Sequence, residues 1–289
     1  MWHADMLLVL VAAIIYGLAF VFRSIRWKQL LKPMGVLSLI RTFWALMFGF
    51  FLNEVLPFRA GEFARAFLVA RWLDIPTATT FGTIVSERMG DIFSLFLLCI
   101  LVSLKLPGAK FPIKSLALAL LIGACVMGAL IRWKDVLRSK QTNSIWLKKT
   151  LGTMDRLIQG FQFIGSARQT IQLILSSIAV WCFDGLAVHV LAKSYGIGLS
   201  TVGTGALMVG IALGVMVPAA PGYIGTYEYF GEKTLKLIGI PPQTALTFVI
   251  SLHLFQMIMI AAFGVPTLAR YGIPKKSDPK ASFDTSINH

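Results

Sequence analysis

The chain has 289 residues, of which 56% are hydrophobic and only 14% are charged, and its mean hydropathy is +0.75. Water-soluble globular domains of this length do not carry so large an apolar fraction, so the composition indicates a polytopic membrane protein with little mass left for a soluble catalytic domain. The formal net charge is +14. Because the basic residues cluster between long apolar runs, this charge indicates contact with anionic lipid head groups and not with nucleic acid.

Cysteine usage and the start of the chain narrow the class further. Cys99, Cys125 and Cys182 each lie inside an apolar stretch and show no paired spacing. This pattern argues against a disulfide framework and against a thiolate metal site, and we expect neither metal nor cofactor. The first apolar run, 6–22, has no basic segment before it and no small-residue cleavage site after it. It therefore predicts a retained helix and not a signal peptide.

Seven apolar stretches approach the ~20 residues that a helix needs to cross a bilayer. Two of them run into proline and glycine, which break a helix, and each break is followed by a short amphipathic return, at 63–73 and 229–238. The seven stretches are 6–22, 36–52, 77–104, 114–131, 169–192, 201–217 and 243–268.

Basic residues in the connecting segments predict the topology, because Lys and Arg mark the cytoplasmic side. They follow the first stretch (Arg23, Arg26, Lys28 and Lys32) and recur in the loop 132–168 and in the tail. Loop and tail lie on the same side only if each broken segment, together with its return, makes an even number of crossings. The return 63–73 spans only about 16 Å as a helix. We therefore predict two re-entrant hairpins that enter from opposite faces of the plasma (inner) membrane, with the N-terminus outside and the C-terminus cytoplasmic.

The resulting fold class is an all-α, polytopic transmembrane helix bundle with two re-entrant broken-helix hairpins in an inverted repeat. Interrupted helices at corresponding places in two halves are typical of carriers whose binding site lies near the midplane. Within the loop, apolar residues at spacings of three and four, from Leu147 to Phe161, predict an amphipathic helix on the inner leaflet. The predicted parts are a single membrane domain 1–270 with inverted halves 6–104 and 169–268, a linker helix 114–131, the cytoplasmic amphipathic loop 132–168 and a cytoplasmic tail 271–289.

The first candidate site surrounds the break after the second stretch. Arg59, Glu62 and Arg65 are spaced by three residues, so a helical return places them on one face, where they can form ion pairs. Guanidinium groups beside free backbone N–H groups suit a phosphate head group. The residues singled out are Asn53, Pro57, Arg59, Gly61, Glu62 and Arg65, with Glu54 beside them.

The second candidate site is Glu87, Arg88 and Asp91 in the stretch 77–104. Glu87 and Asp91 lie about 15 and 21 Å from the start of this stretch, near mid-bilayer, and share a helix face. Ionisable groups at that depth cost at least ~2.5 kcal/mol each, so we expect them to face the bundle interior and to form pairs or contact a charged substrate. The alternative is that all these charges only neutralise one another and hold the hairpin against this helix.

The third candidate site is the second break, where prolines and glycines leave backbone groups that need a cavity, water or ligand. The alternative is a tight turn between helices. Asp184, His189, His253 and Gln256 are interpreted as hydrogen-bond partners between helices. The residues of this third site are Pro218, Pro221, Gly222, Gly225 and Glu228.

These three motifs, in this order over residues 6–268, resemble the lysylphosphatidylglycerol synthase transmembrane-region family, also called the flippase-like domain family. The resemblance implies an integral membrane protein that binds and moves an anionic phospholipid or a polyprenyl-phosphate-type lipid between leaflets. Fused members carry a soluble aminoacyl-transfer domain after the membrane part, whereas only Arg270–His289 follow here. Lysyl transfer by this chain alone is therefore not expected. Stand-alone members suggest a lipid-modifying enzyme or glycosyltransferase as a partner.

Two other function classes stay open. An intramembrane enzyme could use Asp91 and Asp184 as a dyad, but the segment before Asp91 lacks the first glycine of a Gly-x-Gly-Asp site, and the chain has no zinc or serine-nucleophile motif. We therefore predict no catalytic residues. An accessory subunit or scaffold of a lipid-modifying enzyme, or the membrane part of a lysylphosphatidylglycerol synthase-like system, would leave the charged clusters purely structural.

Overall fold

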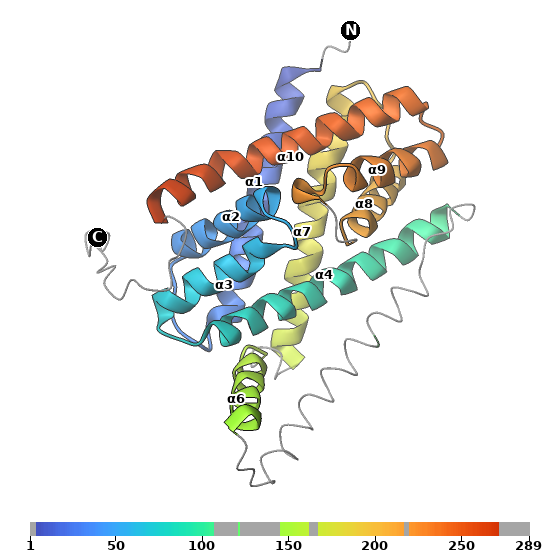
Figure 1. Ribbon diagram of the computed structural model, residues 1–289. Coiled ribbons are helices and arrows are strands. Elements are labelled where there is room, and N and C mark those ends of the chain that lie inside the picture. Colours follow the sequence, from blue (N-terminus) through green and yellow to red (C-terminus); the bar gives the residue numbers. More distant parts are fainter. Residues whose placement is uncertain (1–3, 107–120, 122–144, 162–166, 217–219, 272–289) are drawn as a thin grey trace.

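The computed structural model describes residues 4–106, 121, 145–161, 167–216 and 220–271. Over this part of the chain all regular structure is helical, as the sequence predicts (Figure 1). Pro218, the linker helix 114–131 apart from Leu121, loop residues 132–144 and the tail 272–289 lie outside the described residues. The helices are α1 Met6–Leu31, α2 Leu39–Val55, α3 Ala60–Leu73, α4 Thr77–Lys105, α6 Ile145–Gln159, α7 Ala167–Ser194, α8 Thr201–Met216, the 3-10 turn η2 Pro221–Tyr223, α9 Thr226–Leu237 and α10 Pro242–Tyr271.

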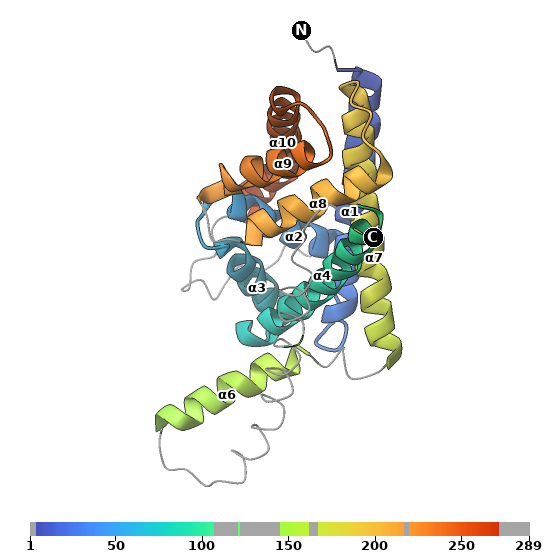
Figure 2. The same ribbon diagram turned by 90° about the vertical axis from the view of Figure 1, so that its right-hand side faces the viewer.

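Helices α1 and α7 form an antiparallel pair (Figures 1 and 2). The amide of Asp5, which caps α1, donates a hydrogen bond of 2.9 Å to the carbonyl of Ser194, the last residue of α7. The outer face of α1 exposes leucine and isoleucine at helical spacing, whereas Ala12 and Ala19 are buried against the rest of the protein. An apolar exposed face is expected where lipid is the solvent. The exposed residues are Leu7, Leu10, Ile14 and Leu18.

The predicted end of the first helix at Phe22 is wrong, because α1 continues to Leu31. Arg23 and Arg26 therefore lie within the helix and not in a loop. Both arginines find carboxylate partners inside the bundle, so their charges do not mark the point where the helix leaves the apolar region. Only Lys28 and Lys32 remain exposed at this end of the helix.

Two helical hairpins flank the α1 and α7 pair: α2 packs against α3, and α8 packs against α9 (Figure 1). The same order of elements occurs twice along the chain. Helix α1, the α2 and α3 hairpin and α4 come first, and after α6 the chain continues with α7, the α8 and α9 hairpin, and α10. Helix α4 contacts both α3 and α8, and α10 contacts both α2 and α9. Helices α4 and α10 thus each pack against both hairpins.

The first hairpin turns at residues 56–59, which we call the first break. Phe58 and Arg59 adopt left-handed backbone conformations, with φ of 57° and 53°. This conformation costs a residue with a Cβ about 1–2 kcal/mol, so packing around the turn must hold it. In the second break, residues 220–225, glycine adopts positive φ at Gly222 (65°) and Gly225 (90°), and Tyr223 between them does so as well, with φ of 58°.

Three described helices, α1, α7 and α10, are long and apolar enough to cross a membrane. Helix α4 has 29 residues, about 43 Å, but carries charged residues in its middle.

The predicted amphipathic segment is helical, as α6, and packs on the start of α4. Gly82 permits this approach, because a Cβ there would lie 2.3 Å from the carbonyl oxygen of Leu157.

Candidate functional site

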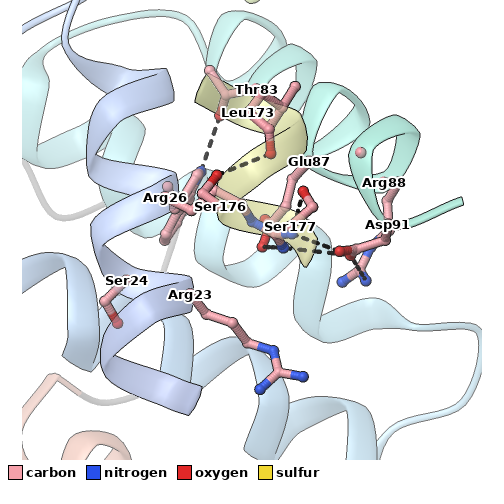
Figure 3. A network of polar contacts seen from close by, with 12 residues as sticks. Arg23, Ser24, Arg26, Thr83, Glu87, Arg88, Asp91, Leu173, Ser176 and Ser177 are labelled. Carbon is pink, nitrogen blue, oxygen red and sulfur yellow. Dashed lines mark hydrogen bonds and ion pairs between the residues drawn. The ribbon is translucent and has the colours of Figure 1, made fainter. Parts of the chain in front are cut away.

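Arg26 of α1 is the centre of a buried polar network. Its Nη1 donates to Asp91 Oδ1 and its Nη2 to Glu87 Oε1, both at 2.6 Å, and Figure 3 shows both contacts. A third hydrogen bond, of 2.8 Å, runs from Nη1 to the hydroxyl of Ser177 on α7. The Arg26 side chain is 1% exposed. These contacts fasten α1, α4 and α7 together, and they confirm that Glu87 and Asp91 share a face directed into the bundle.

Arg65 of α3 is buried on the far side of Glu87. Its Nη2 donates to Glu87 Oε2 at 3.0 Å, and its guanidinium lies 4.7 Å from the ring centre of Trp27. The backbone of Gly49 leaves room for it, since a Cβ there would lie 2.8 Å from Arg65 Cδ. The prediction that Arg65 pairs on the same face as Arg59 and Glu62 is therefore wrong. The α3 helix turns Arg65 into the core, where its long stem packs against α2.

Glu62 and Arg88 lie nearer the surface of this network. Arg88 bonds to Glu62 at 2.8 Å and to Asp91 at 3.2 Å, while Arg59 lies 3.9 Å from Glu62. The side chains of Arg59 and Arg88 are 37% and 32% exposed, against 1% for Arg26. Arg59 and Arg88 are therefore the members of this network that a ligand can reach.

Together these contacts form a chain in which positive and negative groups alternate from the core outward. We call it the alternating chain. Each of its three carboxylates lies between two arginines, so its four arginines leave one positive charge in excess. Its accessible end is Arg59. In order, the members are Arg65, Glu87, Arg26, Asp91, Arg88, Glu62 and Arg59.

Local backbone contacts explain how the first break presents Arg59. Asn53 Oδ1 accepts a hydrogen bond of 2.9 Å from the amide of Gly61, the second residue of α3. Gly61 lies so close to α2 that a Cβ would be 1.9 Å from the carbonyl oxygen of Gly49. Pro57 is exposed in the turn itself. Asn53 and Gly61 thus fix the crossing of the two helices, and Asn53 also lines a cavity.

The two breaks meet. Arg59 Nη2 donates to the carbonyl of Val215, near the end of α8, at 2.8 Å, and its guanidinium lies 5.8 Å from the ring centre of Tyr223. A Cβ on Gly222 would lie 3.2 Å from both the carbonyl oxygen and Oε2 of Glu54. Pro221 begins η2, whereas Gly225 faces open space. Gly222 therefore brings the second break against the end of α2, beside the first break.

Glu228 caps α9 and contacts α10. Its Oε2 accepts a hydrogen bond of 2.7 Å from the amide of Gly225, and its Oε1 lies 2.5 Å from Nδ1 of His253. The ring of His253 stacks on Tyr227 at 4.1 Å, and the Tyr227 hydroxyl donates to Gln256. The sequence interpretation of His253 and Gln256 as partners between helices is confirmed.

Several members of the site were not predicted from the sequence. The count of basic residues places Arg23 and Arg26 in a loop, although their spacing of three also suits one face of a helix. Arg23 forms an ion pair with Asp184 of α7, which makes Asp184 a partner between helices, as interpreted. Asp91 and Asp184 each bond to arginine, and no hydrogen bond joins the two aspartates in the described network.

A cavity of about 440 Å³ lies where the two breaks meet. Aromatic and aliphatic side chains such as Tyr16, Phe50 and Trp181 line it together with charged groups, as expected for a site that holds an amphipathic ligand. Within the described residues, no group of three or more His, Cys, Asp or Glu side chains is arranged to hold a metal ion. The charged and titratable lining residues include Arg23, Glu54, Arg59, Glu62, Arg88, Asp91, Asp184 and His253.

This fold and its charged internal cavity define an all-helical membrane protein. Residues 1–264 match the family described as Lysylphosphatidylglycerol synthase TM region, and the chain belongs to that family. The family resemblance seen in the sequence is thereby confirmed.

Three relatives are informative. The chain is 22% identical to Glycosyltransferase AglD of Haloferax volcanii, over 92% of this chain and 49% of that protein, so it spans about half the length of this relative. It is 24% identical to a UPF0104 membrane protein of Methanocaldococcus jannaschii, over 89% of this chain and 82% of the relative. It is 19% identical to a UPF0104 membrane protein of Methanothermobacter thermautotrophicus, over 93% of this chain and 87% of that relative. The comparison with solved structures found no match.

Proposed function

We propose that the protein binds a lipid with an anionic head group in the cavity and moves it between leaflets. The observation that carries this proposal is the alternating chain, which has one excess positive charge and ends at the accessible Arg59. A phosphate bound to Arg59 would complete the alternation of charges. Uncompensated charge is costly in an apolar interior, so an anionic ligand is favoured at this position.

The hydrogen-bonding state of Arg59 supports this assignment. A guanidinium has five N–H donors, and among the described residues Arg59 makes one hydrogen bond, to Val215, and one long contact to Glu62. The remaining donors are available for two phosphate oxygens. Glu62 lies between Arg59 and Arg88, where it orients both. Glu87 and Arg65, by contrast, are enclosed by the core and stabilise the cavity wall.

An inverted repeat is the arrangement we propose for transport. The corresponding order of α1 to α4 and α7 to α10, and the contact between the breaks, support two re-entrant hairpins that meet near the midplane. In this proposal the N-terminus is outside and the tail cytoplasmic. Helix α6, which carries exposed Arg156, lies on the inner leaflet of the plasma membrane. The cavity would open alternately to each leaflet.

A second candidate is an accessory role beside a lipid-modifying glycosyltransferase. The similarity to Glycosyltransferase AglD favours it, because a segment similar to this chain makes up about half of that longer protein. In that role the cavity would hold the lipid for a partner enzyme without moving it across the bilayer.

Reconstituted transport separates these candidates. Wild-type protein in liposomes should move fluorescent phosphatidylglycerol between leaflets, and Arg59→Lys should reduce the rate about tenfold because lysine lacks the fork that binds two oxygens. Arg156→Lys, the same change on an exposed residue of α6, should leave the rate unchanged. Lipid binding without any movement would favour the accessory role. Equal rates for wild type and Arg59→Lys would contradict the role of Arg59.

A further inference from the structure

Near the meeting point of the two breaks, two carboxylates, Glu54 and Glu228, have no arginine or lysine partner among the described residues. Glu54 Oε2 is buried, and no described group donates a hydrogen bond to it. Glu228 lies 2.5 Å from His253, whose side chain is 6% exposed. The carboxylates of the alternating chain all face guanidinium groups, so this second set differs in having only one imidazole as a possible cation.

Glu54 lines the cavity, whereas Glu228 is reached through the lining residue His253. A neutral imidazole that donates Nδ1–H supplies the proton in the 2.5 Å contact between His253 and Glu228. The buried, unpartnered oxygen of Glu54, by contrast, needs either a proton or a cation. A proton satisfies this oxygen without any further ligand group, because the carboxyl group itself carries it.

We infer that Glu54, near the pair formed by Glu228 and His253, binds a proton, and that this proton binds together with the anionic head group. This inference rests on the proposed function. Glu54 lies beside Gly222 of the second break and near His253, while Arg59 is the fourth residue after the end of α2, in the first break. An ionised Glu54 repels an anion that approaches Arg59, and a protonated Glu54 does not.

Among the groups around Glu54, the Glu54 carboxyl is the one whose charge changes when a proton binds. Arg23 is neutralised by Asp184, and Glu62 is held between two arginines. The facing tyrosines carry no charge near neutral pH. Several elements packed against α2 contribute titratable or charged groups to the cavity beside Glu54 and Arg59. These groups are Tyr16 and Arg23 of α1, Glu62 of α3, Tyr223 of η2 and His253 of α10.

Binding of short-chain phosphatidylglycerol to the purified protein at several pH values tests this coupling. If one proton binds with each anion, the dissociation constant should fall about tenfold for each unit that the pH is lowered, within the range where Glu54 titrates. Glu54→Gln, which mimics the protonated form, should bind tightly at all pH values. Glu232→Gln, on the same helix as Glu228 but paired with Lys236, should behave as wild type.

Infrared difference spectra between acidic and alkaline samples supply a readout that needs no lipid. A protonated carboxyl band should be present in wild type and in Glu232→Gln, and weaker in Glu54→Gln. Lipid binding with no pH dependence, or affinity that follows sodium concentration at constant pH, would overturn the inference and leave the proposed function standing. Absence of lipid binding at every pH would overturn the proposed function and the coupling with it, whereas a band independent of Glu54 would overturn the proton site alone.

Discussion

Arg26 and Asp91 are joined by two hydrogen bonds, of 2.6 Å between Nη1 and Oδ1 and of 3.4 Å between Nη2 and Oδ2. This contact links the buried half of the alternating chain, which ends in Arg65, to the accessible half, which ends in Arg59. The position of the accessible arginines is thereby tied to the packing of α1 against α4. Stability and ligand binding are expected to separate along this chain, with structural residues inside and ligand-binding residues outside.

The first prediction concerns Arg26. Replacing it with methionine leaves Glu87 and Asp91 short of one partner each inside the bundle, and breaking a buried pair in this way costs about 3–5 kcal/mol. Thermal unfolding in detergent should therefore show a large loss of stability and of folded yield for Arg26→Met. Lys28→Met, two residues along the same helix and exposed, is the matched control and should change stability little. Equal stability of the two variants would contradict a structural role for Arg26.

The second prediction concerns the crossing of α2 and α3. Gly61→Ala would place a Cβ 1.9 Å from the carbonyl oxygen of Gly49, so the two helices must move apart. We expect a loss of at least 2 kcal/mol, of the order seen for overpacked cores, and a displaced Arg59. Gly17→Ala in α1 meets no atom within 4 Å and should be neutral or slightly stabilising. Thermal unfolding of both variants decides the matter, and a stable Gly61→Ala protein would show that this crossing is not close-packed.

The third prediction concerns the second break. Gly222→Leu should reduce lipid transport at least tenfold, because its side chain would begin 3.2 Å from Glu54 and extend into the cavity. Gly196→Leu has the same backbone cost, with φ of 70°, but meets open space between α7 and α8. Comparing both variants in the liposome assay separates blocked passage from backbone strain. Similar transport by the two proteins would show that passage does not depend on space at Gly222.

The fourth prediction concerns topology. Gly196 follows α7, whose end is bonded to Asp5, and both should lie outside, whereas Asp74 between α3 and α4 should be cytoplasmic. In a background without the three native cysteines, Gly196→Cys should react with a membrane-impermeant maleimide added to intact cells, and Asp74→Cys should react only after permeabilisation. The reverse pattern would invert the proposed orientation.

Helix positions could largely be predicted from the sequence because apolar length and the prolines and glycines at the breaks are local signals. The error at α1 arose from the same signals. Arg23 and Arg26 look like a membrane exit when they are counted alone, and only the positions of Asp184, Glu87 and Asp91 on other helices explain why the helix continues.

The candidate site could be predicted only as a set of residue types. Spacing placed Glu87 and Asp91 on one face, and it correctly indicated that they form pairs. It could not distinguish Arg59 from Arg65, which are both near the start of α3, because burial depends on how α3 packs against Gly49. The contact of Glu228 with His253, 25 residues apart, likewise depends on the packing of α9 against α10.

Native mass spectrometry tests most directly whether an anionic lipid binds at Arg59. Protein released from nanodiscs that contain equal amounts of phosphatidylglycerol and phosphatidylcholine should retain phosphatidylglycerol in clear excess. Arg59→Gln should remove this preference while Arg156→Gln keeps it, because only Arg59 ends the alternating chain in the cavity. Retention of both lipids in equal amounts by the wild type, or an unchanged preference in Arg59→Gln, would contradict the account.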